Sequence, residues 1–282
     1  MNSYFLQLTL CFCFLVGNVF SQNANPVLPT SGLCAHRGAM ETHPENTIPA
    51  FQAAIHTGAA MIEFDVWLSQ DKEMVVMHDE TVDRTTDGRG EISGMTLAEI
   101  KKLDAGSWKS ADFEGVRVPT LEEVLEIMPY NIWLNIHIKG EGELPAMVAE
   151  LVKKQNRLHQ AFLASSLKGA RKAQKSVPEL MICNMDRQNS TEAYVSGTLR
   201  AKTEFIQLRD GGDSYTSEQL NSLKNAGVKT NYFKANSLAE IKKMLADGID
   251  FPLVNDIVLF MKSAEELGIK PVVPQFDLNL KE

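Results

Sequence analysis

The sequence predicts an α/β protein built as a (β/α)8 TIM barrel, with a small inserted subdomain after the second strand. Short apolar runs alternate with longer amphipathic stretches from residue 30 onward. Eight such strand–helix units fit into about 250 residues, the usual size of this barrel. Polar residues also collect where the first three strands end, which is the face where barrel active sites lie. A doubly wound open sheet is the alternative architecture.

The expected elements follow the hydrophobic periodicity of the chain. The predicted strands cover residues 33–36, 61–66, 132–138, 161–164, 180–183, 204–208, 228–232 and 251–254. Helical patterns lie between them at residues 47–56, 121–128, 144–154, 168–175, 217–225 and 237–246. Three of the helices end in a glycine, as helix C-termini commonly do, at Gly58, Gly227 and Gly248.

One stretch departs from this rhythm. Residues 73–78 indicate a short extra strand, and residues 80–118 form a long connection with a short helix at 97–103. Connections of this length are usually functional insertions or lids. We therefore expect a small subdomain over the barrel mouth, within a single domain that covers residues 22–282.

The composition is that of a folded globular protein. Of the 282 residues, 44% are hydrophobic and 23% are charged, which argues against disorder. Asp and Glu outnumber Lys and Arg by 36 to 28, giving a net charge of -8. Because nucleic-acid binders need a basic field, we expect no nucleic-acid partner. The sequence leaves the oligomeric state open.

The N-terminus has the pattern of a signal peptide covering residues 1–21. An apolar run at residues 5–16 is too short to span a bilayer and precedes a small-residue cleavage site at residues 19–21. We expect an exported protein, periplasmic or secreted, without stable membrane insertion. A buried N-terminal helix is the alternative, and a lipoprotein is disfavoured because Leu10 and Phe12 precede the first two cysteines.

Two cysteines would remain after cleavage. Cys34 and Cys183 both lie in short apolar, strand-like runs, whereas Cys11 and Cys13 would be removed. Such cysteines usually behave as small buried hydrophobic residues. We expect no disulfide framework.

Four short motifs between residues 36 and 79 carry the chemistry. They are His36-Arg37-Gly38, Pro44-Glu45-Asn46-Thr47, Glu63-Phe64-Asp65 and His78-Asp79. Imidazoles move protons near neutral pH, paired carboxylates hold a hard cation, and arginine grips a phosphate or carboxylate at two points. This combination of groups is suited to cutting a phosphate ester.

The carboxylates are placed for a metal ion. Glu63 and Asp65 are two residues apart on a strand, so their side chains share one face. Two adjacent carboxylates inside a barrel repel each other unless a cation or a shared proton lies between them. A metal site is therefore expected, with a solvated pair at the strand end as the alternative.

A second strand repeats this geometry. Asn135, His137 and Lys139 share one face of their strand and indicate the lining of a site, although a lone histidine can also be a hydrogen-bonded core residue. His36 and His78 each lie at a strand end beside a charged residue. Together with the carboxylates they suggest a general acid and a general base, each contributing about 10²–10⁴-fold.

These motifs resemble the glycerophosphodiester phosphodiesterase family. The resemblance is dense over residues 33–139 and thin beyond residue 140. It continues through three further motifs and reaches Lys139: Arg84-Thr85-Thr86-Asp87-Gly88, Leu103-Asp104-Ala105-Gly106-Ser107-Trp108 and Val118-Pro119-Thr120-Leu121-Glu122-Glu123-Val124.

The resemblance implies a metal-dependent barrel enzyme that cleaves small-molecule glycerophosphodiesters to glycerol 3-phosphate and an alcohol, a step in lipid metabolism. It implies that His36 and His78 are the acid–base pair and that Arg37 and Lys139 contact the phosphate. Glu63 and Asp65 would be metal ligands, with calcium or magnesium as the usual ion.

The chain departs from the family pattern in three places. His137 stands where the family has a glutamate, and we expect it to be the third metal ligand. Nitrogen suits manganese or zinc better than calcium, and protonation of His137 would release the metal below about pH 6.5. Residues 228–233 and 255–256 also differ from the family's last two strands, so the alcohol or glycerol pocket is expected to differ.

Two other functions remain open from the sequence. Internal attack by a substrate hydroxyl would make the protein a phosphodiester lyase that releases a cyclic phosphate. A degenerate barrel that binds a phosphate-containing ligand without catalysis is the alternative from another class of protein.

Overall fold

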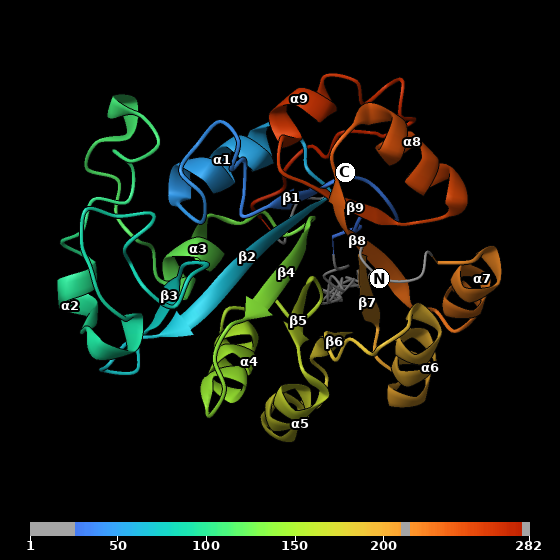
Figure 1. The fold of residues 1–282 in the computed structure, drawn as a ribbon, viewed down its shortest axis with the longest axis horizontal. Coiled ribbons are helices and arrows are strands. Elements are labelled where there is room, and N and C mark those ends of the chain that lie inside the picture. The colour runs from blue at the N-terminus through green and yellow to red at the C-terminus, as the bar shows by residue number, and fades with distance from the viewer. Residues whose placement is uncertain (1–25, 210–214, 278–282) are drawn as a thin grey trace, which may run out of the picture.

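Eight parallel strands close into a barrel in the computed structural model, which describes residues 26–209 and 215–277 (Figure 1). The barrel strands are β1 (Cys34–His36), β2 (Met61–Leu68), β4 (Trp133–Ile138), β5 (Ala161–Ser165), β6 (Met181–Asn184), β7 (Phe205–Arg209), β8 (Lys229–Ala235) and β9 (Phe251–Val254). Strand β1 pairs in parallel with both β2 and β9, which closes the sheet. This closure confirms the predicted barrel and excludes the open sheet.

The alternation of side chains explains why the strands pack as they do. Ile62, Phe64 and Val66 are fully buried in the apolar layer between the strands and the helices. A second apolar cluster, with Met61 and Phe162 among its members, is also formed by strand residues. Burying a large apolar side chain stabilises a fold by about 1.5–3 kcal/mol, so a one-residue slip of a strand would be costly.

The helices surround the barrel in Figure 1. They are α1 (Ile48–His56), α3 (Leu121–Ile127), α4 (Leu144–Lys154), α5 (Leu167–Ser176), α6 (Thr191–Ala201), α7 (Ser217–Asn225), α8 (Leu238–Asp247) and α9 (Ile257–Met261). All six predicted helices are present. As expected, Gly58, Gly227 and Gly248 adopt positive φ angles of 81°, 74° and 98° just beyond helix ends.

The hydrophobic periodicity of the sequence did not predict helices α6 and α9. Helix α6 contains Gly197 and several hydroxyl residues, which are weak helix formers. Its start is fixed by Ser190, whose side chain accepts a hydrogen bond from the amide of Ala193. Helix α9 has only five residues, too few to show a clear period.

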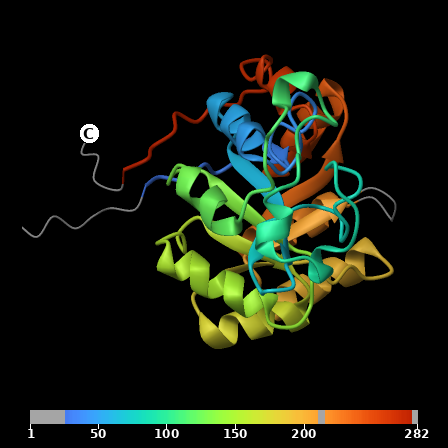
Figure 2. The same cartoon turned by 90° about the vertical axis from the view of Figure 1, so that its left-hand side faces the viewer.

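The long connection after β2 begins with β3 (Met74–Val76), which pairs antiparallel with β2. It continues through η1 (Ile92–Gly94), α2 (Leu97–Ile100) and η2 (Ala111–Phe113). The segment lies beside the arrowhead of β2 in Figure 1 and in front of the strands in Figure 2. It has a small apolar cluster of its own, formed by Val75, Met77, Val82, Ile92, Ile100, Ala105 and Val118.

Cys34 and Cys183 are buried and are not joined in a disulfide, which agrees with their prediction as buried apolar residues. Among the described residues, no helix combines the length and the apolar character needed to cross a membrane. The predicted signal peptide at residues 1–21 lies outside the described residues.

Candidate active site

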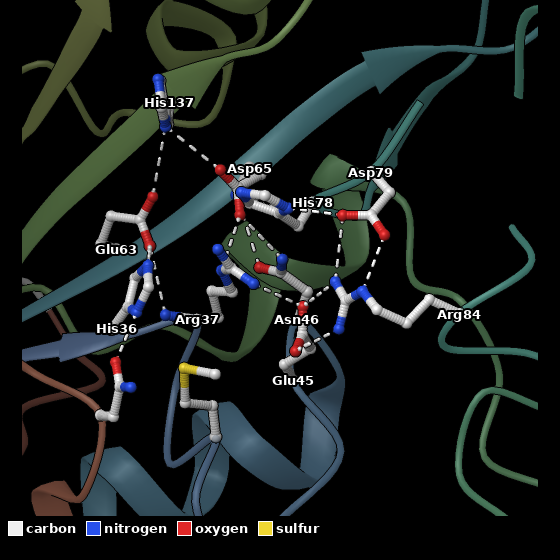
Figure 3. Close-up of polar contacts among 12 residues, drawn as sticks. His36, Arg37, Glu45, Asn46, Glu63, Asp65, His78, Asp79, Arg84 and His137 are labelled. Atoms are coloured by element: carbon white, nitrogen blue, oxygen red, sulfur yellow. Dashed lines mark hydrogen bonds and ion pairs between the residues drawn. The ribbon is translucent and has the colours of Figure 1, made fainter. Parts of the chain in front are cut away.

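The carboxyl ends of three neighbouring strands bring the predicted site residues together (Figure 3). His36 is the last residue of β1, and Glu63 and Asp65 lie in β2. In the parallel register of β2 and β4, Asp65 lies opposite His137, and Lys139 follows β4 directly. His78 follows β3 at the start of the long connection. The expected clustering at one face of the barrel is therefore confirmed.

Glu63, Asp65 and His137 form a compact group that fits a divalent cation. One ligand atom from each residue lies within 4.8 Å of the others. Nδ1 of His137 lies 3.2 Å from Oδ1 of Asp65 and 3.6 Å from Oε1 of Glu63. Oδ1 of Asp65 is buried and receives no hydrogen bond from the part of the chain that the structure describes, so the group retains an acceptor that a cation can use. Two carboxylates and one imidazole are ordinary donors to divalent metals.

The two carboxylates change the acid–base behaviour of His137. Burial by itself would lower the pKa of His137, but its interactions with Asp65 and Glu63 outweigh this effect and raise the pKa to about 9. A metal must displace the proton on the imidazole, so proton and metal compete up to about pH 9. The expectation of competition below about pH 6.5 used the ordinary pKa of histidine, and the raised pKa of His137 extends the competition to higher pH.

Asp65 remains ionised because cations surround it. Burial by itself would raise the pKa of Asp65, but His137, Lys139 and Arg37 hold the pKa well below its ordinary value. Nζ of Lys139 lies 3.7 Å from Oδ1 of Asp65, and Nε of Arg37 lies 3.5 Å from Oδ2. Asn46 fixes the other side, since its Nδ2 donates to Oδ2 at 3.0 Å. The predicted phosphate contacts Arg37 and Lys139 thus both reach the carboxylate pair.

His36 is held by neutral groups that lie at the end of the neighbouring strand β9 and in β8. Its Nδ1 lies 2.8 Å from Oδ1 of Asn255, which is an acceptor, so Nδ1 carries the proton and Nε2 keeps its lone pair. Nε2 lies 3.9 Å from Oε2 of Glu63. The ring of Phe233 meets the imidazole edge-on at a centroid distance of 5.3 Å. Burial lowers the pKa of His36 and outweighs the attraction of Glu63, which favours the neutral imidazole.

His78 is held by a charged group instead. Its Nδ1 lies 2.6 Å from Oδ1 of Asp79, and its backbone carbonyl accepts a hydrogen bond from Nε1 of Trp67. Hydrogen bonds from Arg84 lower the pKa of Asp79 to about 2, so the carboxylate is charged at neutral pH. The contact with Asp79 orients the imidazole ring of His78.

Arg84 connects the pair of His78 and Asp79 to Glu45. Its Nη1 and Nη2 donate to the two carboxylate oxygens of Glu45 at 2.9 and 2.8 Å, while its Nε donates to Asp79. Arg37 donates to the same carboxylate at 2.8 Å. Glu45 is only 6% exposed, and both arginines compensate its buried charge. A continuous chain of ion pairs therefore joins His78 to Arg37.

The sequence prediction gave no role to four residues that support the site. Each of the four lies in one of the motifs, or in one of the departures from the family pattern, that the sequence shows. The sequence therefore marked these positions. Only the folded chain reveals which groups they contact: Glu45, Asn46, Arg84 and Asn255.

Comparison with known proteins agrees with this geometry. The sequence profile of the Glycerophosphoryl diester phosphodiesterase family matches residues 36–251. The glycerophosphodiester phosphodiesterase of Caldanaerobacter subterraneus is 36% identical over 228 residues, covering 79% of this chain and 93% of that protein.

Solved structures share the fold. The glycerophosphodiester phosphodiesterase of Agrobacterium tumefaciens superimposes with a TM-score of 0.71 at 28% identity, covering 82% of this chain and 99% of that one. A phosphodiesterase of Oleispira antarctica, solved in complex with the product sn-glycerol-3-phosphate, gives a TM-score of 0.73 at 27% identity, covering 84% and 97%. The chain thus belongs to the Glycerophosphoryl diester phosphodiesterase family and is a phosphoric diester hydrolase.

Proposed function

We propose that the protein hydrolyses glycerophosphodiesters to glycerol 3-phosphate and an alcohol, with His36 and His78 as the acid–base pair. The proposal rests on one observation. His36 and His78 lie near the same pair of carboxylates but contact different partners. Figure 3 shows His36 beside Glu63 and His78 on the side of Asp65. The product named in the Oleispira antarctica structure supports this choice of substrate.

The contacts of the two histidines suggest a division of roles. Neutral His36 accepts at Nε2 the proton of the attacking water, as the water oxygen bonds to phosphorus. The bond from phosphorus to the alcohol oxygen breaks, and the imidazolium of His78 gives its proton to the departing alkoxide. Asp79 orients the ring of His78 for this transfer. General acid–base assistance of this kind is typically worth about 10²–10⁴-fold per group.

We propose that Glu63, Asp65 and His137 hold one divalent cation, which would neutralise charge on the phosphate oxygens. Arg37 and Lys139 then contact the phosphate, since both cations already face the carboxylate pair. The nitrogen of His137 favours manganese or zinc over the calcium or magnesium expected from a third carboxylate.

Calorimetric titration of the metal-free protein tests the choice of metal. We expect manganese or zinc to bind more tightly than calcium, and His137→Glu to strengthen calcium binding about tenfold or more, since calcium prefers oxygen ligands. Calcium that binds best and is unaffected by His137→Ala would contradict the assignment.

An assay of the metal-free protein tests the reaction itself. Glycerophosphocholine, glycerophosphoethanolamine and glycerophosphoinositol are supplied with calcium, magnesium, manganese or zinc, and the products are followed by phosphorus NMR. Glycerol 3-phosphate without a cyclic intermediate is expected. Release of a cyclic phosphate would instead identify internal attack, and binding without any phosphomonoester would support the non-catalytic alternative.

We further propose that the protein is exported, to the periplasm or the medium, and acts on the deacylated products of phospholipid breakdown. The pattern of residues 1–21 supports export. Expression in the native cell, followed by fractionation and N-terminal sequencing, should give a chain that begins near residue 22. A full-length N-terminus in the cytoplasm would contradict this.

A further inference from the structure

A cavity of about 200 Å³ lies next to the candidate active site. The loop between β4 and α4 and the first turn of α5 line it, so it lies between two neighbouring connections at the carboxyl face of the barrel. Lys139 belongs to both places, because it lines the cavity and its Nζ lies 3.7 Å from Oδ1 of Asp65. A substrate bound at the carboxylate pair could therefore extend into the cavity.

The lining of the cavity is positively charged. Lys139, Lys168 and Lys172 line it together with a single carboxylate, that of Glu141. Nζ of Lys168 lies 3.3 Å from Oε2 of Glu141, and Nζ of Lys172 donates to the carbonyl of Gly142 at 2.8 Å. Both partners of the Lys168–Glu141 pair are well exposed, and such pairs contribute little. The two lysines of α5 can therefore turn to an anionic ligand at small cost.

A buried hydroxyl group adds a specific polar contact. Ser165 is only 5% exposed and lines the cavity. Its hydroxyl can donate a hydrogen bond to an anionic ligand in the cavity. Gly169 leaves room for it, since a Cβ atom at that position would come within 2.2 Å of Oγ of Ser165.

The N-terminus of α5 also contributes to the positive charge around the cavity. The helix has ten residues, so its N-terminus carries a substantial positive partial charge. Asp186 already accepts the first amide, that of Leu167, at 3.0 Å. The remaining attraction for an anion therefore comes mainly from Lys139, Lys168 and Lys172 rather than from the helix.

We propose that this cavity is a subsite for a phosphate monoester carried by the leaving alcohol of the substrate. The inference rests on the proposed hydrolysis of glycerophosphodiesters and specifies the class of alcohol. The carboxylate pair and its metal hold the diester, and Lys139 separates it from the cavity. A second phosphate would meet Lys168, Lys172 and the hydroxyl of Ser165, and ammonium groups and hydroxyls are good donors to phosphate oxygens.

A matched pair of substrates tests the subsite. Glycerophosphoinositol and glycerophosphoinositol 4-phosphate differ only in the second phosphate. We expect the wild-type protein with its metal to show a kcat/KM at least about tenfold higher for the phosphorylated substrate. The double variant Lys168→Gln/Lys172→Gln should lose this preference. Lys175→Gln is the control, because Lys175 is exposed on the same helix but does not line the cavity.

Binding of the product alcohol provides a measurement that is independent of turnover. Inositol 4-phosphate should bind the wild-type protein at least about tenfold more tightly than the double variant in calorimetry, and myo-inositol should show no such difference. Equal binding by both proteins, or equal kcat/KM for the two substrates, would overturn the subsite. Absence of cleavage with intact product binding would overturn the proposed hydrolysis alone.

Discussion

The two sides of the barrel mouth hold their histidines in opposite ways. His78, beside the long connection, contacts the charged carboxylate of Asp79, which Arg84 anchors. His36, at the end of β1, contacts the neutral amide of Asn255 and the ring of Phe233. His78 thus has a charged partner, whereas burial among neutral groups lowers the pKa of His36 and favours its free base. The comparison shows how one fold places two identical side chains in different electrostatic surroundings.

The side of the site that holds His78, the charged side, also has the more extensive network of ion pairs. Four charged side chains, those of Asp79, Arg84, Glu45 and Arg37, form one continuous chain of ion pairs. On the neutral side, a single hydrogen bond to Asn255 orients the imidazole. We therefore expect substitutions on the charged side to have the larger effects, apart from loss of either histidine.

Loss of either histidine should have the largest effect. We expect His36→Ala and His78→Ala each to reduce kcat by about 10²–10⁴-fold, because each removes one proton transfer. Steady-state assays of both variants measure this. The control is His56→Ala, since His56 is exposed on α1. Full activity in either of the first two variants would remove that histidine from the mechanism.

The stability of the metal-free protein should depend on pH through His137. Its folded pKa of about 9 exceeds the ordinary value, so the stabilisation is complete below about pH 6.5 and disappears as pH rises through 9. The linkage amounts to at most about 3.4 kcal/mol. Urea unfolding of the metal-free wild type at pH 6 and pH 9.5 measures the loss.

The variant His137→Gln is the comparison for this pH effect. Because glutamine does not titrate, the variant should lose less stability than the wild type over the same pH interval. An identical pH dependence in both proteins would show that His137 carries no excess proton in the folded state.

Breaking the ion-pair chain at its centre should have an intermediate effect. Arg84→Gln leaves Asp79 without its cation and Glu45 with Arg37 alone. We expect kcat to fall about tenfold or more, because contacts to charged groups are worth about 1.5–3 kcal/mol. Arg89→Gln is the control, since the side chain of Arg89 is 89% exposed and its Nη1 lies 3.7 Å from Oδ2 of Asp83. Equal effects of the two changes would refute a role for the chain.

The neutral side should give the smallest effect. Asn255→Ala removes one hydrogen bond from His36, worth about 1 kcal/mol, so kcat should fall only about fivefold. A changed acidic limb of the pH–rate profile would distinguish loss of orientation from a general structural effect. Asn236→Ala, at an exposed position after β8, should change neither quantity. A loss as large as that of His36→Ala would contradict the comparison between the two sides.

The sequence predicted the barrel because its signals are local. Strand β9 has the predicted limits, and the two-residue spacing of Glu63 and Asp65 correctly placed both on one face. Position at the end of a strand was likewise enough to place His36 and His137 at the carboxyl face. Helix α6 had no predicted boundaries because its glycine and hydroxyl residues blur the helical period.

The supporting contacts could not be predicted because they join residues far apart in the chain. Asn255 reaches His36 across 219 positions, which only closure of the barrel makes possible. The pairing of Arg84 with Glu45 depends on how the long connection folds back to the segment between β1 and α1. The sequence showed these residues within motifs but did not show their partners.

The sequence by itself determined the fold class, the reacting groups and the face of the barrel on which they lie, because alternation and spacing along a strand are local properties. Tertiary structure alone decided the shifted pKa values of His36 and His137. The pKa of a group depends on its burial and on the charges around it, and those neighbours come from other strands. His137 illustrates the difference, since its pKa of about 9 results from two carboxylates on the neighbouring strand.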